Sequence, residues 1–352
     1  MTIRVGLIGF GLSGRIFHTP FVMNDAGMTM TYVCSSKTDD VHAVLPDVTV
    51  VPSADLVCAA TEVDLVVIST PNALHFELAK LALLNGKHVL LETPSVTQLV
   101  QIEALCTLAK QKGLVFCVYQ NRRFDGDFLR LSALIKEGTL GELKHLDSRF
   151  DRFCPTVPAH WREEPGAGAG VFWGLGSHLL DQALCLFGPP KWLHASIDSL
   201  RDNSQTHDWF EIELGYDDKR IRLASTPFEA GDMRRFNARF TQGSWQCVGQ
   251  DPQEEALQVG QMPWEPYFPS KASQQRNTRF VASSQGDIEP ILESSTQGCY
   301  ASFYRQLRDA ILGKADAPVS MKQACQLVYL LGLAEQSAES GQRMSWWYMP
   351  RF

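Results

Sequence analysis

The sequence contains no apolar run long enough to cross a bilayer, no internal repeat and no low-complexity segment. Its start shows no basic segment followed by an apolar stretch and a cleavage site, so we expect no export signal. The formal net charge of -7 opposes non-specific attraction to nucleic acid or to an anionic membrane. These absences lead us to expect a cytoplasmic globular protein whose partners include neither nucleic acid nor a membrane.

Patterns typical of disulfide frameworks and metal sites are also missing. The nine cysteines are scattered along the chain, with no CxxC pair and no cluster with histidine at the spacing of metal ligands. We interpret them as reduced and mostly buried thiols, and we expect no bound metal. A chain of 352 residues is nevertheless long enough to form about two domains with substantial apolar cores.

The clearest motif is a strand, a glycine-rich turn and a helix at the start of the chain. The apolar run Ile3–Ile8 predicts a buried strand, and Arg15–Met23 can continue as a helix. In a dinucleotide-binding turn, the first glycine permits a tight turn, the second lets the backbone approach a pyrophosphate, and the third allows close packing. This context favours a cofactor site over a purely structural turn. The six residues with the pattern GxGxxG are Gly9, Phe10, Gly11, Leu12, Ser13 and Gly14.

Alternating strand and helix patterns extend from this motif to about residue 125. Strands are predicted at Met28–Cys34, Asp64–Thr70, His88–Leu91 and Leu114–Tyr119, and helices at Phe76–Leu84 and Val96–Lys112. The fold class is therefore α/β, with a doubly wound parallel sheet of the Rossmann type in residues 1–125. Ligands collect at the carboxyl ends of such strands. We expect cofactor contacts from the residues there: Ser35, Ser36, Lys37, Thr70, Pro71, Asn72, His75, Glu92, Thr93, Asn121 and Arg122.

The end of the second strand bears on the choice of cofactor. NAD-selective sites place an acidic residue about twenty positions after the glycines, to bind the ribose 2'-hydroxyl. Here Ser35, Ser36 and Lys37 occupy that stretch, and the first carboxylate is Asp39. Two hydroxyls and a cation suit a 2'-phosphate, so we expect NADP(H), with NAD(H) as the other possibility. Ser36 and Lys37 could instead belong to an ordinary solvated loop.

Residues 126–352 are predicted to form a second α/β domain for substrate binding and oligomerisation. Its sheet should be open and mostly antiparallel, with one face buried and the other free to pair in a homodimer or homotetramer. The polar segment Gln250–Ser295 is expected to have little regular structure, and Trp346–Tyr348 to be docked. Strands are expected at Leu143–Phe153, Trp192–Leu200, Trp209–Tyr216, Arg220–Phe228 and Phe236–Thr241. Helices are expected at Asp127–Glu137, Leu175–Phe187, Tyr300–Leu312 and Lys322–Glu339, the last two completing this domain or folding back on the first.

Two polar residues on one predicted helix are candidates for proton transfer. His178 and Asp181 are three residues apart and therefore share a helix face. An imidazole titrates near neutrality, so His178 is the candidate acid/base group, and Asp181 could fix its tautomer. Each has an alternative: His178 could be a core or surface histidine, and Asp181 a buried carboxylate that pairs with an arginine.

Four residues are candidates for lining the ligand pocket. Arg122 and Arg123 follow a strand end, so one could reach cofactor or substrate while the other forms a structural ion pair. Tyr119 could line the substrate pocket or pack in the core. Trp161 could form an apolar wall for a sugar ring, although tryptophan is more often a core residue.

With the glycine turn, TPNxxH, ETP, NRRFD and GSHLLD in this order, the chain resembles the Gfo/Idh/MocA oxidoreductases from Ile3 to about Gln336. The resemblance implies a Rossmann domain, a second domain with a mostly antiparallel sheet, and assembly as a dimer or tetramer. It also implies hydride transfer between a nicotinamide cofactor and a sugar, cyclitol or related polyol. By the same resemblance, the peptide bond between Thr93 and Pro94 is expected to be cis.

Two positions depart from the family pattern. Thr93 stands where the family has its catalytic lysine, and Gly174 where it has an aspartate four residues before His178. A positioned acid or base contributes ~10²–10⁴-fold in rate, or about 3–5 kcal/mol. His178 would have to take over the proton, and Thr93 could only hydrogen-bond a substrate hydroxyl. The alternative is a cofactor-binding sensor or partner-binding protein with impaired catalysis.

Overall fold

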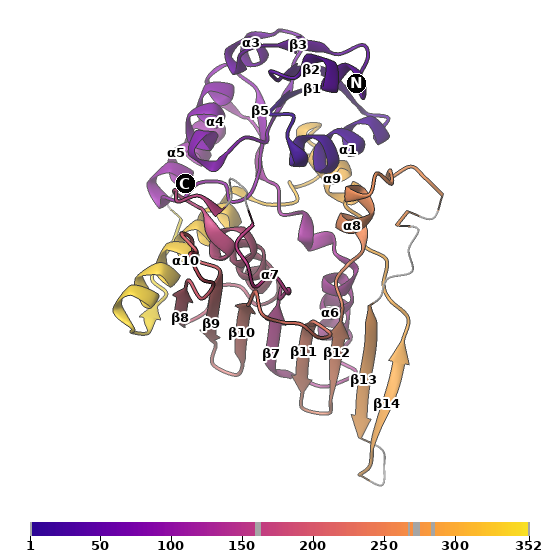
Figure 1. Ribbon diagram of the computed structural model, residues 1–352, viewed down its shortest axis with the longest axis vertical. Coiled ribbons are helices and arrows are strands. Elements are labelled where there is room, and N and C mark those ends of the chain that lie inside the picture. The colour runs from indigo at the N-terminus through magenta and orange to yellow at the C-terminus, as the bar shows by residue number, and fades with distance from the viewer. Residues whose placement is uncertain (1, 159–162, 267, 270–274, 283–285, 351–352) are drawn as a thin grey trace.

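Two β-sheets organise the chain, one above the other in Figure 1. A computed structural model of the protein describes residues 2–158, 163–266, 268–269, 275–282 and 286–350. The upper sheet has six strands and the lower sheet nine, and each belongs to its own apolar core. The α/β fold class predicted from the sequence is confirmed. Among the described helices, none is long and apolar enough to cross a membrane.

The first sheet is entirely parallel and has the Rossmann strand order β3-β2-β1-β4-β5-β6. Its strands are β1 (Ile3–Ile8), β2 (Met28–Cys34), β3 (Thr49–Val51), β4 (Leu65–Ile68), β5 (His88–Leu91) and β6 (Phe116–Val118). The helices between them are α1 (Thr19–Asn24), α2 (Thr38–His42), α3 (Ala54–Ala59), α4 (His75–Leu84) and α5 (Leu99–Lys112). Each predicted strand of this domain is present, because strands covered on both faces are apolar throughout. Strand β3 is too short to produce a hydrophobic period and is not predicted.

The second sheet has the strand order β14-β13-β12-β11-β7-β10-β9-β8-β15. All its pairs are antiparallel except the parallel pair β7 and β10. This confirms the expected open and mostly antiparallel sheet. Its strands are β7 (Leu143–Arg149), β8 (Trp192–Asp198), β9 (Trp209–Gly215), β10 (Arg220–Ser225), β11 (Arg234–Phe240), β12 (Gly243–Val248), β13 (Arg276–Ala282), β14 (Ile288–Glu293) and β15 (Met344–Ser345).

The expectation that Gln250–Ser295 has little regular structure is wrong. The segment contains the helix α8 (Gln253–Gln258) and the hairpin of β13 and β14, which extends the sheet at one edge in Figure 1. Strand β14 is exposed at nearly every residue. An edge hairpin that buries so little side-chain surface does not need alternating apolar residues, so its strands give a weak sequence signal.

The helices of the second half cover one face of its sheet and also join the two halves. Apolar side chains of α6 (Gly126–Glu137), α7 (Ser177–Phe187) and α10 (Met321–Ser340) share one core with the sheet. The helix α9 (Ala301–Ile311) folds back on the first domain, where Tyr304 stacks on Phe21 of α1 with ring centroids 5.6 Å apart. At the C-terminal end, Tyr348 stacks on Tyr329, whereas Trp347 is 82% exposed, so the tail is docked only in part.

Candidate active site

The glycine turn has the geometry that close approach of a dinucleotide requires. Gly9 has a φ of 97°, and a Cβ there would lie 2.3 Å from the carbonyl oxygen of Ser69. A Cβ at Gly14 would lie 2.1 Å from the carbonyl oxygen of Gly9, which shows close packing of the helix on the strand. A Cβ at Gly11 would meet nothing within 4 Å, so there is space beside the turn. These three positions fit the roles predicted for them.

The neighbouring strand ends add polar atoms to this turn. The hydroxyls of Ser69 and Thr70 are buried and have no hydrogen-bond partner among the described residues. Buried polar atoms are normally satisfied, so these two are suited to binding a ligand. The stretch Ser35–Lys37 lies directly beside the turn, because the backbone amide of Gly9 donates to the carbonyl of Cys34. Ser36 and Lys37 are exposed there.

Two residues of the TPNxxH motif are engaged with other loops. Asn72 donates from Nδ2 to the carbonyl of Gly168, at 2.9 Å, and so joins the glycine-rich loop of the second half to the first. His75 is fully buried, and its ring nitrogens lie 2.9–3.0 Å from the carbonyl oxygens of Thr70, Pro94 and Ser95. His75 therefore ties the loops that follow β4 and β5 together. A direct cofactor contact by His75, which the sequence suggested, is not supported, because its nitrogens face carbonyl groups.

The carboxylate of Glu92 lies at the end of β5 and accepts several hydrogen bonds. His18 Nε2 lies 2.9 Å from its Oε1, the hydroxyl of Ser13 donates to the same oxygen, and the amide of Thr93 donates to Oε2 at 2.9 Å. Burial alone would raise the pKa of Glu92, but the hydrogen bonds and the charge of His18 lower it to about 2. Glu92 is therefore ionised at neutral pH.

His18 is a site residue that the sequence did not reveal. It is fully buried, and its Nδ1 lies 2.5 Å from the hydroxyl of Tyr304. The chain forms a π-turn over Gly14–His18, which overlaps the start of the predicted helix Arg15–Met23. Such turns are frequent at functional sites. A reading based on the α-helical period cannot place this histidine.

In the second half, a π-turn over Phe172–Gly176 directly precedes α7, and His178 is the second residue of that helix. The residue is 9% exposed, and its Nδ1 lies 2.9 Å from Oε1 of Gln120, which follows β6. Burial lowers the pKa of His178 to about 3, and the positive charges of Arg122 and Arg235 add to this effect. The negative charge of Glu92 acts in the opposite direction. Gln120 is a candidate site residue that is not predicted from the sequence, because no distinctive motif surrounds it.

The expected contact between Asp181 and His178 is not formed. Both carboxylate oxygens of Asp181 accept hydrogen bonds from Arg123, at 2.6 and 2.7 Å. This is the alternative in which Asp181 pairs with an arginine, and a buried guanidinium without that carboxylate would be costly. Arg122 is likewise paired, with Glu254 and with Asp125. Both arginines are thus held by acidic side chains, whereas an ion pair is expected from the sequence for only one of them.

The remaining predicted residues have mixed positions. Tyr119 belongs to the core, since its hydroxyl donates to the carbonyl of Phe17 and its ring is fully enclosed. Asn121 is buried in a short helix, and Trp161 lies outside the described residues. Thr93 is partly exposed, and its bond to Pro94 is cis, as the family resemblance implies.

Gly174 is open enough to accept a side chain. A Cβ at this position would meet no heavy atom within 4 Å. A Cβ can therefore be introduced at this position without a clash, so a substitution here is a practical test. No group of three or more His, Cys, Asp or Glu side chains suited to a metal ion occurs among the described residues.

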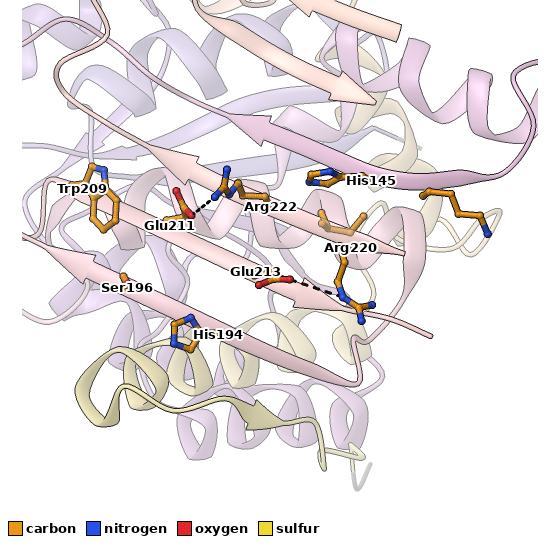
Figure 2. Close-up of a pocket in the computed structure, with 10 residues that line it drawn as sticks. His145, His194, Ser196, Trp209, Glu211, Glu213, Arg220 and Arg222 are labelled. Atoms are coloured by element: carbon orange, nitrogen blue, oxygen red, sulfur yellow. Dashed lines mark ion pairs between the residues drawn. The ribbon is translucent and has the colours of Figure 1, made fainter. Parts of the chain in front are cut away.

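A hollow elsewhere on the molecule is unrelated to these residues. Figure 2 shows it on the outer face of the second sheet, lined by charged and aromatic side chains of β7, β8, β9 and β10. Two ion pairs cross it, between Glu211 and Arg222 at 2.9 Å and between Glu213 and Arg220 at 3.9 Å. Its open, charged surface lies away from the carboxyl ends of the Rossmann strands, where ligands of this fold bind.

Comparison with known proteins covers both halves of the chain. Residues 3–120 match the family described as oxidoreductase family, NAD-binding Rossmann fold. Residues 128–246 match the GFO/IDH/MocA C-terminal domain. The two matches account for the glycine turn and for the helix that carries His178.

Whole-chain relatives agree with these matches. The chain is 38% identical over 340 residues to the uncharacterised oxidoreductase YdgJ of Escherichia coli (strain K12), covering 96% of each protein. It is 32% identical over 345 residues to the scyllo-inositol 2-dehydrogenase (NADP(+)) IolW of Bacillus subtilis (strain 168), covering 96% of this chain and 94% of IolW. The solved structure of the oxidoreductase yvaA from Bacillus subtilis superposes with a TM-score of 0.94 at 30% identity, covering 98% of both chains.

Proposed function

Because this chain belongs to the Gfo/Idh/MocA family of oxidoreductases, we propose that it transfers a hydride between NADP(H) and a sugar, cyclitol or related polyol, or the corresponding ketone. The observation that carries the proposal is a buried imidazole, His178, within electrostatic reach of the ionised Glu92 of the nucleotide-binding half. The relative IolW is named a scyllo-inositol 2-dehydrogenase (NADP(+)), which supports both the substrate class and the cofactor.

The chain's own residues handle binding and the proton, while a bound nicotinamide supplies the hydride acceptor or donor. His178 is neutral at pH 7 because its pKa is lowered to about 3, so its unprotonated ring nitrogen can accept the proton of an alcohol. The negative charge of Glu92 raises the pKa of His178 and so stabilises the imidazolium formed in that step. In the reverse direction, His178 returns the proton to the carbonyl oxygen. Thr93 is partly exposed beside Glu92 and can hydrogen-bond a second hydroxyl of the substrate.

The cofactor would be held by the Gly9–Gly14 turn and by the hydroxyls of Ser69 and Thr70. Selection of NADP(H) over NAD(H) rests on Ser36 and Lys37, which are exposed at the end of β2. Lys37 forms a long ion pair with Asp40, with 3.9 Å between Nζ and Oδ2. A cation held this loosely can turn toward a 2'-phosphate.

Binding and turnover are tested separately. Fluorescence titration should show tighter binding of NADPH than of NADH, and the reverse order would contradict the cofactor assignment. Turnover is then measured with NADP⁺ and a panel of inositols, including scyllo-inositol, and aldoses. His178→Ala should abolish most of the activity, whereas retention of full activity would remove this histidine from the mechanism.

A second candidate function is a cofactor-binding protein without turnover, which the departures at Thr93 and Gly174 favour. Tight NADPH binding without activity on any member of the panel would support it. The double variant Thr93→Lys/Gly174→Asp introduces the lysine and the aspartate that the family resemblance implies at these two positions. Gly174 has space for a Cβ. Activity that arises only in this variant would identify the parent chain as a catalytically impaired member of the family.

The outer face of the second sheet is proposed to pair with a second copy of the chain. Glu211 and Glu213 on β9 lie beside Arg220 and Arg222 on β10, so the face carries neighbouring acidic and basic rows (Figure 2). A two-fold axis through such a face can bring each row against its opposite. Arg222→Glu should convert a dimer or tetramer to smaller species in analytical ultracentrifugation, and a monomeric parent chain would overturn this proposal. Independently of this pairing, we propose that the protein is located in the cytoplasm.

A further inference from the structure

We propose that Gln120 positions His178 for proton transfer, by accepting a hydrogen bond from Nδ1 and so leaving the lone pair on Nε2. This inference rests on the proposed function, in which His178 is the acid/base group. It replaces the role that the sequence suggested for Asp181. The structural evidence is the geometry of three side chains: Gln120, His178 and Asp181.

The hydrogen bond between Gln120 and His178 lies in the interior of the protein. Oε1 of Gln120 is 2.9 Å from Nδ1 of His178, and Gln120 is only 1% exposed. The backbone of Gln120 is held at both ends, since its amide donates to Val118 and its carbonyl accepts from Arg123. The amide nitrogen Nε2 of Gln120 has no partner among the described residues. The only side-chain hydrogen bond of Gln120 in that set is therefore the one to His178.

This pairing determines which ring nitrogen can act as a base. A carbonyl oxygen accepts and cannot donate, so a proton on Nδ1 is required to form the bond. In a neutral imidazole the other nitrogen, Nε2, then carries the lone pair. Nε2 of His178 has no hydrogen bond within the described part of the chain. It is therefore available to a ligand.

Asp181 cannot perform this task in the observed arrangement. Both of its oxygens are held by Arg123 through a bidentate pair, so its charge is already compensated. A neutral amide also has a different electrostatic effect from a carboxylate. It orients the ring without adding a negative charge, and the charges that face His178 remain those of Arg122, Arg235 and Glu92. A base oriented in this way stays unprotonated at neutral pH.

The tautomer can be measured directly and without a substrate. Long-range ¹H–¹⁵N correlation spectra of protein labelled at the histidine ring nitrogens distinguish a proton on Nδ1 from one on Nε2. The signals of His178 are assigned by their loss in His178→Asn. We expect the Nδ1–H tautomer in the parent protein. An Nε2–H tautomer would overturn the proposal, whatever the outcome of the activity measurements.

Variants of Gln120 separate positioning from a merely structural role. Gln120→Leu should release the ring to a mixture of tautomers, whereas Gln120→Glu should keep the proton on Nδ1 and raise the pKa of His178 in an NMR titration. Asp181→Asn should leave the tautomer unchanged, and Gln111→Leu, on the exposed face of α5, controls for the substitution itself. An unchanged tautomer in Gln120→Leu, or a changed one in Asp181→Asn, would contradict the proposal.

Kinetics provide a second measurement once a substrate is found. A histidine in the wrong tautomer can cost up to ~10⁴-fold in kcat in the serine protease triad. We expect Gln120→Leu to lower kcat by roughly 10–100-fold, because the correct tautomer remains partly populated. Retained NADPH binding would show that the cofactor half is intact. An unchanged kcat together with a changed tautomer would contradict the proposed role of His178, and not the positioning by Gln120.

Discussion

The two halves of the candidate site differ in the kind of atoms that they offer a ligand. In the Rossmann half, a glycine turn leaves open space beside its backbone, and the two buried hydroxyls of Ser69 and Thr70 have no partner among the described residues. Around His178, in the second half, the site consists of buried side chains from both halves, and its charged members Arg122, Arg123 and Asp181 are held in ion pairs. A backbone site depends on conformations that few residue types allow. A side-chain site depends on partners that are distant in the sequence.

The largest expected effect is at the glycine turn. Gly9→Val places a β-branched residue at a φ of 97° and a Cβ 2.3 Å from a carbonyl oxygen. We expect a loss of roughly 4 kcal/mol or more in the free energy of unfolding, with loss of NADPH binding. The matched control is Gly11→Ala, where nothing lies within 4 Å. It should change stability by less than about 0.5 kcal/mol while weakening NADPH binding, and denaturant unfolding with NADPH titration checks both. A Gly9→Val protein as stable as the parent would refute the tight-turn assignment.

In the second half, the largest expected effect is on catalysis. His178→Ala should lower kcat by ~10²–10⁴-fold, because a positioned acid or base is lost. NADPH affinity should be unchanged, since the nucleotide turn belongs to the other half of the molecule. Steady-state kinetics on an identified polyol and NADPH titration give the two quantities. A parallel loss of kcat and NADPH affinity would show that the two halves do not act separately.

The ion pair of Asp181 and Arg123 should affect stability rather than proton transfer. Both side chains are at most 10% exposed, so Asp181→Ala leaves a buried guanidinium without its carboxylate. We expect a loss of about 3 kcal/mol in the free energy of unfolding, measured by urea denaturation. The kcat of the folded fraction should change far less than in His178→Ala. A loss of kcat as large as that of His178→Ala would restore Asp181 to the mechanism.

Lowering the pH should decrease the free energy of unfolding through protonation of His178 in the unfolded chain. The pKa of His178 is about 3 in the folded protein, against 6.5 for the free side chain, so the unfolded chain binds the proton first as the pH falls. The contribution of His178 to the free energy of unfolding is complete above pH 6.5. It declines as the pH falls toward 3, and about 2 kcal/mol is lost at pH 5. The difference in unfolding free energy between the parent and His178→Gln, measured from pH 7 to pH 5, should shrink by this amount. A constant difference would show that the histidine is not held in its neutral form.

The smallest expected effect concerns the choice of cofactor. Lys37 is exposed, so its replacement should change affinity by only about 0.5–1 kcal/mol. Lys37→Glu should lower affinity for NADPH a few-fold and leave NADH binding nearly unchanged, as judged by fluorescence titration at low salt. Equal losses for both cofactors would indicate a general electrostatic effect instead of recognition of the 2'-phosphate.

Prediction from the sequence succeeded where local patterns carry the structural information. The strands β1, β2 and β5 have the predicted bounds, because a run of apolar residues between glycine or polar turns is itself the signal of a buried parallel strand. The helix that carries His178 and the ETP motif could likewise be identified from local sequence. The hairpin of β13 and β14 was missed because an exposed edge strand does not need an apolar period.

The roles of individual side chains depended on contacts across the molecule. Local sequence was sufficient to establish the Rossmann turn and the two-domain α/β plan, since the conformations involved are restricted by glycine and by the burial of whole strands. It could not establish that His18 reaches Glu92, that Gln120 reaches His178, or that Asp181 belongs to Arg123. These partners are 58 or more positions apart, and a π-turn contains His18 while another ends two residues before His178. Folding brings them together, and the pairing of buried polar groups is then imposed by the cost of leaving any one of them unsatisfied.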